Sequence, residues 1–396
     1  MNNKKNLMLM CPMLHQGGFE RVCVATARLM QEYYNVYILI FTSKDMHYDV
    51  KGLNVIDIDV PARDGVIYKL LNMCKRIIRV RKAKKKLGIN YTYSFGSSAN
   101  MVNALSGVGD HVFTGLRGQI DLENQRQIKL FARKSHRILS CSMDIVHQLR
   151  DNFDYDRSKC IYNPVDAEAI RNKAMEQIHD FPFAGDDLKV IACMARDDYQ
   201  KGVWHLVKAF YLALTKCPQA RLLILGEGKW SGYTELVRKL GIKDKVAFVG
   251  AKTNPFPYVS AASIYVCPSN HEGFPNSVLE AMALKKPVIS CDCRTGPREI
   301  LLSEDEYNVL TLTKSGDSIT EPLDGEYGIL VPNMEETENF DAESISREER
   351  MLAEEMVSLL QDEKKAQNYS DKAYKRAGFF TPDKYKEKLH NIIEKL

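Results

Sequence analysis

Two glutamates of this 396-residue chain are spaced so that their carboxylates could bind one ligand together. Glu272 lies in the loop expected after an apolar run, and Glu280 lies in a helix that Pro275 or Asn276 begins. The partly helical chain between them keeps the carboxylates within roughly 12 Å of each other, at about 1.5 Å per helical residue. That span is comparable to the distance from the ribose to the hexose of a nucleotide sugar, so each glutamate could bind the hydroxyl groups of one of them.

The backbone at the start of this helix could bind an anion. The first-turn amides of Asn276, Ser277 and Val278 would point at the ligand, and the helix dipole favours negative charge there. The alternative is an amphipathic helix with a capping carboxylate. That alternative leaves Glu272 and the Gly-Phe-Pro turn that follows it unexplained.

Two cations follow a different apolar run. Arg196 and Lys201 come after the expected strand Val190–Met194 and could hold a diphosphate, the arginine by its planar fork and the lysine as a point charge. A solvated turn is the alternative, because Asp197 and Asp198 lie alongside and could pair with both cations.

Paired glycines follow the first apolar run. Gly17 and Gly18 would let backbone amides approach a diphosphate closely at a helix start, although a tight strand-to-helix turn uses the same residues. Gly226-Glu227-Gly228 also follows an expected strand, but Ser231 takes the place of the third glycine of a dinucleotide fingerprint. A nicotinamide enzyme is therefore disfavoured.

Short apolar runs alternate with segments of helical period, and these elements must position the residues above. Unbroken apolar runs are typical of strands covered on both faces, and the alternation predicts an α/β protein with parallel sheets. The expected strands are Leu7–Cys11, Val36–Phe41, Val55–Ile58, Tyr91–Phe95, Arg137–Cys141, Val190–Met194, Leu222–Leu225, Val246–Val249, Ile264–Cys267 and Val288–Cys291. The expected helices include Phe19–Glu32, Val203–Thr215 and Asn276–Leu284.

The alternating elements form two series that meet near Asn163-Pro164-Val165-Asp166. The sequence therefore predicts one domain over 1–168 and a second over 169–378. Thr381-Pro382 is typical of a helix N-cap and first helical position, so a terminal helix should run to Leu396. Ligands collect at the carboxyl ends of parallel strands, and the motifs above follow expected strands.

Composition limits the class of protein. An apolar content of 45% and a charged content of 27% are ordinary for a globular enzyme, and a net charge of +4 is too small to indicate a partner. The ten cysteines include no CxxC pair, so buried thiols are favoured over disulfides or a zinc site. No signal-peptide pattern and no run of about 20 apolar residues is visible, which predicts a cytoplasmic protein.

The glutamate motif resembles a known family. Glu272 and Glu280 form a Glu-x7-Glu pattern, and the block from Glu272 to Ile300 is similar to the retaining family 4 glycosyltransferases. These have the GT-B fold, in which two Rossmann-like domains with parallel sheets face a central cleft. The resemblance continues through Gly17-Gly18, Asn163-Pro164-Val165-Asp166, Arg196, Lys201 and Gly328-Ile329-Leu330-Val331-Pro332. Asn254–Tyr258 and Gly296–Ile300 look most like the bacterial members that build capsule, O-antigen or lipid-linked oligosaccharide chains.

The resemblance implies a reaction and a division of labour. The chain would move a hexose or N-acetylhexosamine from a UDP-sugar, with retention, to a saccharide acceptor on a polyprenyl diphosphate. The first domain would bind the acceptor and the second the donor, and the terminal helix, 379–396, would return to the first domain. Two alternatives keep the fold but change the reaction, to a nucleotide-sugar epimerase or a soluble disaccharide synthase.

The resemblance also implies a role for each matching residue. Arg196 and Lys201 would bind the donor diphosphate, Glu280 the ribose and Glu272 the transferred sugar, so that Glu272, Arg196 and Lys201 form the catalytic set. The other expected donor contacts are Asn276, Ser277, Val278, the backbone at Ala251 and Lys252, and Gly17 and Gly18 from the other domain.

The expected acceptor region is less well marked. Many relatives carry a histidine in a first-domain loop beside the acceptor, and the corresponding stretch here is Thr114-Gly115-Leu116-Arg117-Gly118-Gln119. Arg117 is therefore placed in the acceptor region. Binding of a phosphate or of a helix end by Arg117 is the alternative.

No metal or other cofactor is expected. The resemblance favours same-face attack through an oxocarbenium-like state, in which the departing phosphate takes the acceptor proton. A covalent route would require a carboxylate at the anomeric carbon, and no residue is singled out for that role. Arg196, Lys201 and the helix amides would stabilise the leaving group in place of a metal. Asp57-Ile58-Asp59 and Asp154-Tyr155-Asp156 match an Asp-x-Asp metal motif by chance.

A basic segment suggests a further partner. Lys69–Lys86 contains nine basic residues and no acid, interleaved with apolar residues. Such a helix indicates binding to an anionic membrane surface, which a lipid-linked acceptor would require, so we expect a protein peripheral to the inner face of the cell membrane. An ordinary helix with solvated lysines is the alternative. Nucleic acid could use the same segment, but no recognised module or stacking pattern supports it.

Overall fold

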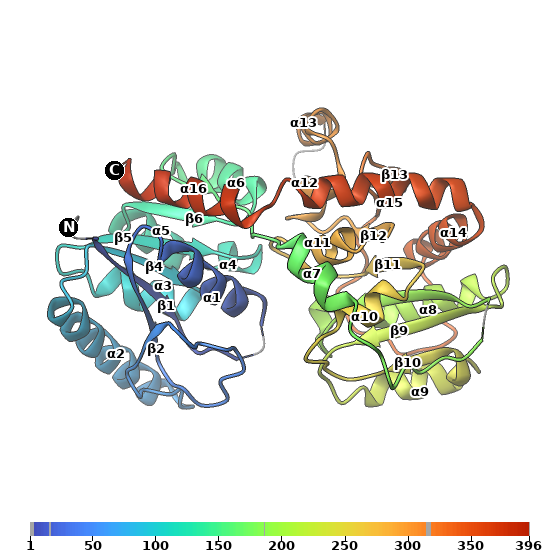
Figure 1. Ribbon diagram of the computed structural model, residues 1–396, viewed down its shortest axis with the longest axis horizontal. Helices are drawn as coiled ribbons and strands as arrows, with labels where there is room; N and C mark the ends of the chain where they lie inside the picture. Colours follow the sequence, from blue (N-terminus) through green and yellow to red (C-terminus); the bar gives the residue numbers. More distant parts are fainter. Residues whose placement is uncertain (1–3, 16, 186, 314–317, 396) are drawn as a thin grey trace. The chain divides into compact units, whose positions relative to one another are not determined.

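The computed structural model describes residues 4–15, 17–185, 187–313 and 318–395. It divides the chain into two compact units, which are described separately (Figure 1). Unit 1 contains the residues up to Pro164 and those from Pro382 on, and unit 2 runs over Val165–Thr381. The first boundary therefore lies at Pro164 rather than at 168, and the second at Thr381 rather than at 378.

Unit 1 is built on a seven-stranded parallel sheet with the order β3-β2-β1-β4-β5-β6-β7. Its strands are β1 (Asn6–Cys11), β2 (Asn35–Ile40), β3 (Asn54–Asp57), β4 (Tyr91–Phe95), β5 (His111–Leu116), β6 (Arg137–Ser140) and β7 (Lys159–Cys160). Its helices are α1 (Gly18–Met30), α2 (Val66–Lys86), α3 (Ser97–Leu105), α4 (Ile120–Glu123), α5 (Gln125–Lys134), α6 (Met143–Phe153) and α16 (Pro382–Glu394).

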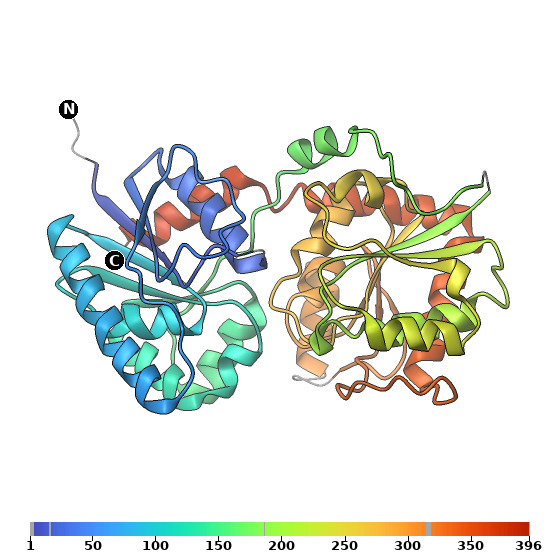
Figure 2. The ribbon, with the colours of Figure 1, turned by 90° about the horizontal axis from the view of Figure 1, so that it is seen from below.

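Both faces of this sheet are covered, which explains the unbroken apolar strands. Alternate side chains of a strand point to opposite faces. Leu7 and Leu9 of β1 pack with residues of α1 and α16, whereas Met8 and Met10 pack with residues of α2 and α3. Figures 1 and 2 show these two helix pairs on opposite sides of the sheet.

The C-terminal helix α16 is an integral part of unit 1. Leu389 and Ile393 are buried in the same core as β1 and α1. The Tyr385 hydroxyl lies 2.7 Å from the Thr26 hydroxyl, and the Tyr34 hydroxyl donates to the Glu394 carboxylate at 2.9 Å. Unit 1 is therefore completed by residues that follow the whole of unit 2 in the chain.

Unit 2 is built on a second seven-stranded sheet, with the order β10-β9-β8-β11-β12-β14-β13, in which only the short β13 is antiparallel. Its strands are β8 (Lys189–Met194), β9 (Ala220–Leu225), β10 (Val246–Phe248), β11 (Ile264–Cys267), β12 (Val288–Cys291), β13 (Leu323–Asp324) and β14 (Ile329–Val331). Its helices are α7 (Ala167–Ala174), η1 (Tyr199–Lys201), α8 (Val203–Ala213), α9 (Ser231–Lys239), η2 (Lys243–Lys245), α10 (Phe256–Ser260), α11 (Asn276–Ala283), α12 (Pro297–Leu301), α13 (Glu304–Thr313), α14 (Arg347–Gln361) and α15 (Glu363–Ala377).

Each sheet has a point at which the strand order reverses. In unit 1 this point lies between β1 and β4, and in unit 2 it lies between β8 and β11. The connections that leave the two strands there run to opposite sides, so a crevice opens at their carboxyl ends, and ligands of such sheets bind there. The loops after β8 and β11 carry Arg196, Lys201 and Glu272.

The predicted α/β class with parallel sheets is confirmed, and the ten expected strands are present to within two residues at each end. The expectation of a loop over Thr114–Gln119 was wrong at its start, because Thr114–Leu116 belong to β5. The glycine at position 115 explains why the sequence did not indicate this strand. A Cβ there would lie 2.5 Å from the Ser94 carbonyl oxygen, so close packing with β4 requires glycine at a position where sequence patterns suggest a turn.

Within the described part of the chain, no helix combines the length and the hydropathy needed to cross a bilayer.

Candidate active site

An ion pair joins the loops at the reversal point of unit 2. Lys201 ends η1 after β8, Glu272 follows β11, and the Lys201 Nζ donates to Glu272 Oε1 at 2.7 Å. The two side chains are 22% and 12% exposed, so the pair is shielded but reachable. Burial would lower the pKa of Lys201, but the adjacent Glu272 carboxylate outweighs burial and raises the pKa. Lys201 is therefore held as a cation in a fixed position.

Backbone contacts fix the two loops against each other. The amides of Asn270 and His271 donate to the Gln200 carbonyl oxygen at 2.9 and 3.3 Å. Gly202 has a φ of +57°, and a Cβ there would lie 2.2 Å from the Pro268 carbonyl oxygen. Glycine next to Lys201 is thus needed both for the left-handed conformation and for close approach of the loops.

Arg196 lies in the same loop and is more exposed than Lys201. Its Nη2 is 3.7 Å from Asp198 Oδ2, and its side chain is 55% exposed, so this pair is loose. Asp197 Oδ2 instead accepts from the amides of Lys229 and Trp230 at 3.1 and 3.0 Å, and among the described residues Asp197 forms no ion pair with either cation. The alternative of a turn neutralised by both aspartates therefore holds only for the weak Arg196–Asp198 contact.

The glycines after β9 serve packing against this loop. A Cβ at Gly226 would lie 1.8 Å from the Ala195 carbonyl oxygen, and one at Gly228 would lie 2.1 Å from the Asp197 Cβ. The loop after β9 therefore rests directly on the loop that carries Arg196. This contact accounts for both glycines of Gly226-Glu227-Gly228 by packing alone.

Helix α11 begins beside Glu272 and carries the remaining expected donor contacts. Asn276, Ser277 and Val278 form its first turn, where amides lack acceptors within the helix, and Pro275 at the N-cap supplies no side-chain cap. The Tyr265 hydroxyl of β11 accepts from the Met194 amide of β8 at 3.1 Å, which ties these two strands together.

Glu280 lies further along α11 and is only 7% exposed. The helix places it one turn beyond Asn276, because residues four apart share a face. A nearly buried carboxylate needs hydrogen-bond donors, and Glu280 is engaged in the structure. Its position supports a binding role but does not test it.

A third loop supports Glu272 and was not assigned a role in the sequence. The Thr295 hydroxyl after β12 donates to the Glu272 carbonyl oxygen. Gly296 has a φ of +93°, and a Cβ there would lie 2.8 Å from the Gly273 carbonyl oxygen. The Gly-Pro-Arg run over 296–298 was the signal that could have revealed this contact, since it marks a tight turn at the carboxyl end of a strand.

The same loop is anchored by a buried ion pair. Arg298 Nε and Nη2 donate to Asp292 Oδ1 and Oδ2, both at 2.6 Å. The Asp292 carboxylate also accepts from the Ile319 amide at 2.8 Å. Ile319 lies in the connection between α13 and β13, so part of that connection helps to hold the third loop; residues 314–317 lie outside the described residues.

Ala251 and Lys252 follow β10, at the edge of the sheet. The Lys252 Nζ donates to Asp180 Oδ2 at 2.5 Å and lies 5.1 Å from the centre of the Tyr258 ring. The hydrogen bond with Asp180 raises the pKa of Lys252. The side chain is thus occupied within the unit, and contact of this backbone with a base stays a prediction.

In unit 1, the glycines expected to touch the donor lie at the reversal point. Gly18 is the first residue of α1, and the Gly17 amide and carbonyl both bond to the Tyr48 hydroxyl, at 3.2 and 2.6 Å. Tyr48 thus fixes the entry to α1. Binding of a diphosphate by Gly17 and Gly18 stays a prediction.

Arg117 lies at the end of β5 and has protein partners. Its Nη2 donates to Asn163 Oδ1 at 2.9 Å, its amide donates to Asp121 Oδ2 at 2.7 Å, and its guanidinium lies 5.2 Å from the centre of the Phe95 ring. These contacts tie the carboxyl end of β5 to the end of unit 1. A role in the acceptor region stays a prediction.

The basic segment Lys69–Lys86 is helical, as α2, but one of its lysines is not available to a partner. Lys84 is fully buried, and its Nζ donates to Asp110 Oδ2 and Asn103 Oδ1, both at 2.9 Å. Lys84 is therefore not among the lysines of this segment that could face anionic lipid. The helical period places position 84 on the side of α2 that faces the core. A lysine is tolerated there because Asp110 lies opposite and compensates its charge.

Sequence and structure comparisons identify relatives of this chain. The family described as "Glycosyl transferases group 1" matches residues 188–342, which include Arg196, Lys201, Glu272 and Glu280. The chain is 33% identical over 238 residues to an uncharacterized glycosyltransferase of Methanocaldococcus jannaschii, an alignment covering 59% of this chain and only 56% of that relative. It is 25% identical over 328 residues to a Campylobacter jejuni N-acetylgalactosamine-N,N'-diacetylbacillosaminyl-diphospho-undecaprenol 4-alpha-N-acetylgalactosaminyltransferase, covering 78% and 87% of the two chains.

Solved structures share the fold. HepE of Anabaena, in complex with UDP-glucose, superposes with a TM-score of 0.73 at 16% identity, covering 99% of this chain and all of that one. The sucrose-phosphate synthase of Thermosynechococcus elongatus gives a TM-score of 0.72 at 17% identity, covering 99% of each chain. Residues 188–342 thus match the glycosyl transferases group 1 family, and the whole chain shares the GT-B fold with these solved structures.

Proposed function

We propose that this protein is a glycosyltransferase that moves a hexose or N-acetylhexosamine from a UDP-sugar to a saccharide on a polyprenyl diphosphate, with retention of configuration. The observation that carries the proposal is the Lys201–Glu272 ion pair beside the first turn of α11, at the reversal point of the unit 2 sheet. HepE is named in complex with UDP-glucose, and the Campylobacter enzyme is named for a diphospho-undecaprenol acceptor.

The donor contacts follow from charge and position. Lys201 and the exposed Arg196 supply positive charge for the diphosphate, and the α11 amides supply donors for its oxygens. Glu280 accepts from the ribose hydroxyls. Glu272 accepts from hydroxyls of the transferred sugar with the carboxylate oxygen that Lys201 leaves open, and its other oxygen keeps Lys201 in place.

The reaction exchanges one glycosidic bond for another. The bond from the anomeric carbon to the diphosphate oxygen breaks, the acceptor hydroxyl oxygen bonds to the same face, and its proton passes to the departing phosphate. Negative charge grows on the leaving diphosphate, so cations already held in place lower the barrier. We propose that Arg196, Lys201 and the α11 amides fill this role without a metal ion.

We further propose that the enzyme works on the cytoplasmic membrane surface, through α2. Six large apolar side chains of this helix are half-exposed or more, namely Val66, Ile67, Tyr68, Leu70, Leu71 and Ile78. Ile67, Leu71 and Ile78 recur at three- and four-residue multiples and so share one face, which continues into the exposed Lys82 and Lys85. An apolar stripe that leads into lysines suits insertion among anionic headgroups.

Mass spectrometry of products tests the reaction. The enzyme is incubated with UDP-glucose, UDP-galactose and their N-acetylhexosamine counterparts, together with a short polyprenyl-diphosphate disaccharide. Growth of the lipid-linked glycan by one sugar, with release of UDP, is expected, and NMR of the new anomeric proton should show the donor configuration. An isomerised UDP-sugar without transfer would indicate an epimerase instead. Transfer to a free sugar phosphate alone would indicate a soluble synthase, the activity named for the Thermosynechococcus neighbour.

A further inference from the structure

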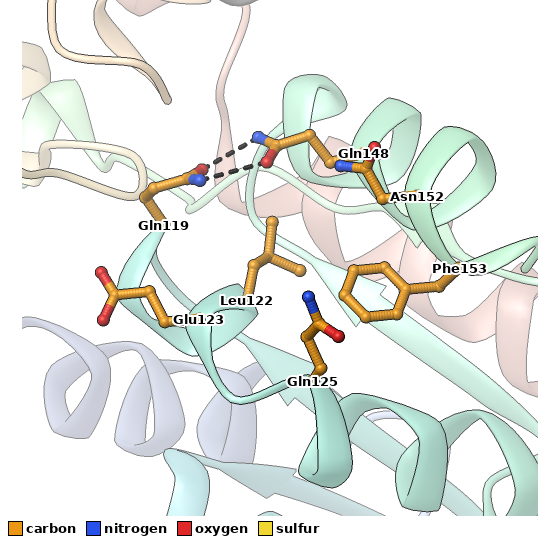
Figure 3. Close-up of a pocket in the computed structure, with 7 residues that line it drawn as sticks. All are labelled: Gln119, Leu122, Glu123, Gln125, Gln148, Asn152 and Phe153. Atoms are coloured by element: carbon orange, nitrogen blue, oxygen red, sulfur yellow. Dashed lines mark hydrogen bonds between the residues drawn. The ribbon is translucent and has the colours of Figure 1, made fainter.

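A pocket in unit 1 begins at Gln119, the last residue of the stretch in which the acceptor region is expected. It is formed by α4, α5 and α6, and its volume is about 320 Å³, within the range of about 300–1,000 Å³ that is usual for ligand sites. Figure 3 shows its lining, which consists of Gln119, Leu122, Glu123, Gln125, Gln148, Asn152 and Phe153.

The chemistry of this lining is unusual for a surface hollow. Four of the seven side chains are amides and one is a carboxylate, and they surround the apolar Leu122 and the half-buried ring of Phe153. An amide both donates and accepts hydrogen bonds, as a sugar hydroxyl does. An aromatic face with nearby amides can therefore receive the apolar C–H face of a pyranose ring while the amides bind its hydroxyls.

The inner part of the pocket is already organised. Gln119 Nε2 donates to Gln148 Oε1 at 3.1 Å, and Gln148 Nε2 donates to Gln119 Oε1 at 2.9 Å (Figure 3). Gln148 Nε2 also donates to Asp144 Oδ2 at 2.5 Å, and its side chain is only 7% exposed. These bonds fix the orientation of both amides before a ligand arrives, which reduces the entropy lost on binding.

The outer part of the pocket offers groups that are open to a ligand. Glu123, Gln125 and Asn152 are exposed, and within the described residues none of the three side chains bonds to another part of the protein. In Figure 3 the Gln125 amide and the Phe153 ring point into the same space. The pocket thus combines a fixed inner pair with free outer amides.

The charge of the pocket lining indicates which part of a lipid-linked acceptor it could bind. The lining contains Glu123 and no lysine, arginine or histidine. A diphosphate or a nucleotide would meet a carboxylate with no cation to offset it, whereas neutral hydroxyl and acetamido groups would meet suitable partners. We propose that this pocket binds a neutral sugar residue of the acceptor glycan, a subsite that rests on the proposed glycosyl transfer.

Saturation-transfer NMR tests the subsite without requiring turnover. The probes are three neutral disaccharides that lack lipid and phosphate, namely N,N'-diacetylchitobiose, lactose and maltose. At least one should bind the wild-type enzyme, and Gln125→Ala with Asn152→Ala should weaken that binding at least about tenfold. Gln127→Ala is the matched control, since Gln127 lies on α5 but does not line the pocket. Both variants remove exposed or partly exposed side chains, so their folding should be intact, as UDP affinity will show.

The outcomes separate this inference from the proposed reaction. Loss of disaccharide binding in the double variant, with UDP binding retained, supports the subsite. In turnover assays the same variant should show a raised KM for the lipid-linked acceptor with an unchanged kcat. No binding of any probe to the wild type, or equal binding by the double variant and the Gln127→Ala control, overturns the subsite. Disaccharide binding without any glycosyl transfer would overturn the proposed reaction instead.

Discussion

Lys201 and Glu272 are 71 residues apart in the chain, yet their side chains meet at 2.7 Å because β8 and β11 are neighbours in the unit 2 sheet. Each charge stabilises the other, and neither could be buried alone without a substantial free-energy cost. In the proposed site, Lys201 would face the diphosphate and Glu272 the transferred sugar. The integrity of the pair is therefore the first quantity to test.

Donor binding should depend on two residues of unit 2, one at the end of η1 after β8 and one in α11. Lys201→Ala and Glu280→Ala should each weaken UDP binding about 10- to 100-fold, because a hydrogen bond to a charged group contributes about 1.5–3 kcal/mol. Titration calorimetry measures this, with Lys216→Ala as the control because Lys216 is exposed and lies between α8 and β9, before the amino end of that strand. Unchanged affinity in both site variants would remove the assignment.

Replacing Glu272 should alter the pH dependence of turnover. The Glu272 carboxylate outweighs burial and raises the pKa of Lys201, so the wild-type lysine stays charged to high pH. In Glu272→Gln, burial acts without that opposition, the pKa of Lys201 should fall, and the alkaline limb of kcat should move to lower pH. Rate profiles between about pH 7 and pH 10.5 decide this; superimposable limbs would show that the two charges are not coupled.

Turnover should survive removal of metal ions. The positive charge of the proposed site comes from Arg196, Lys201 and the start of α11, which are groups of the protein itself and not of a bound metal ion. Initial rates with excess EDTA should equal those with EDTA that has been saturated with magnesium. Activity that disappears with chelator and returns with magnesium or manganese would contradict metal-independent transfer.

Two neighbouring lysines of α2 should differ sharply in their effect on stability. Lys84→Gln should lower the free energy of unfolding by about 3–5 kcal/mol, because it leaves Asp110 buried without its cation. Lys85→Gln is the matched control and should change stability by less than about 0.5 kcal/mol, because Lys85 is exposed. Urea unfolding measures both, and equal stabilities would refute the buried pair.

The loss of stability in Lys84→Gln should depend on pH, and the direction follows from the pKa of Asp110. Burial would raise the pKa of Asp110, but Lys84 and the hydrogen bonds from Val108 and Thr92 outweigh it and hold the pKa below its ordinary value. The stabilisation is therefore present above about pH 4, the unfolded value, and is lost as the pH falls through the folded pKa. The difference in the free energy of unfolding between the wild type and Lys84→Gln should therefore become smaller at acid pH. There Asp110 is protonated in the variant and no longer carries an unpaired charge.

Membrane binding should require the exposed face of α2. Ile67→Glu with Leu71→Glu should release the enzyme from anionic vesicles. Lys82→Gln with Lys85→Gln should weaken binding and reduce its sensitivity to salt, since each surface lysine contributes about 1 kcal/mol that salt can screen. Met175→Glu is the control, because Met175 is a comparably exposed apolar residue of unit 2. Flotation with phosphatidylglycerol vesicles decides it, and equal recovery of all variants would leave α2 an ordinary surface helix.

Local sequence was sufficient for most of the strands, although not for β5, and for the residues near the proposed chemistry. Strands buried on both faces must be apolar throughout, so β1, β8 and β11 could be read directly from runs of residues. The start of α11 was equally clear, because Pro275 and the residues after it obey rules that act within one helical turn. The order of these motifs was enough to indicate the family.

Strand order and packing decided the rest. The partner of Lys201 depends on which strands become neighbours, and apolar runs do not encode that order. The sequence does not distinguish Lys84 from Lys82 and Lys85, yet it is Lys84 that pairs with Asp110. Asp110 precedes β5, a strand that the sequence did not indicate because it contains Gly115. The pocket between α4, α5 and α6 likewise brings together residues from separate segments. Such contacts depend on burial and on charges distant in the chain, so they become visible only when the sheet has brought their residues together.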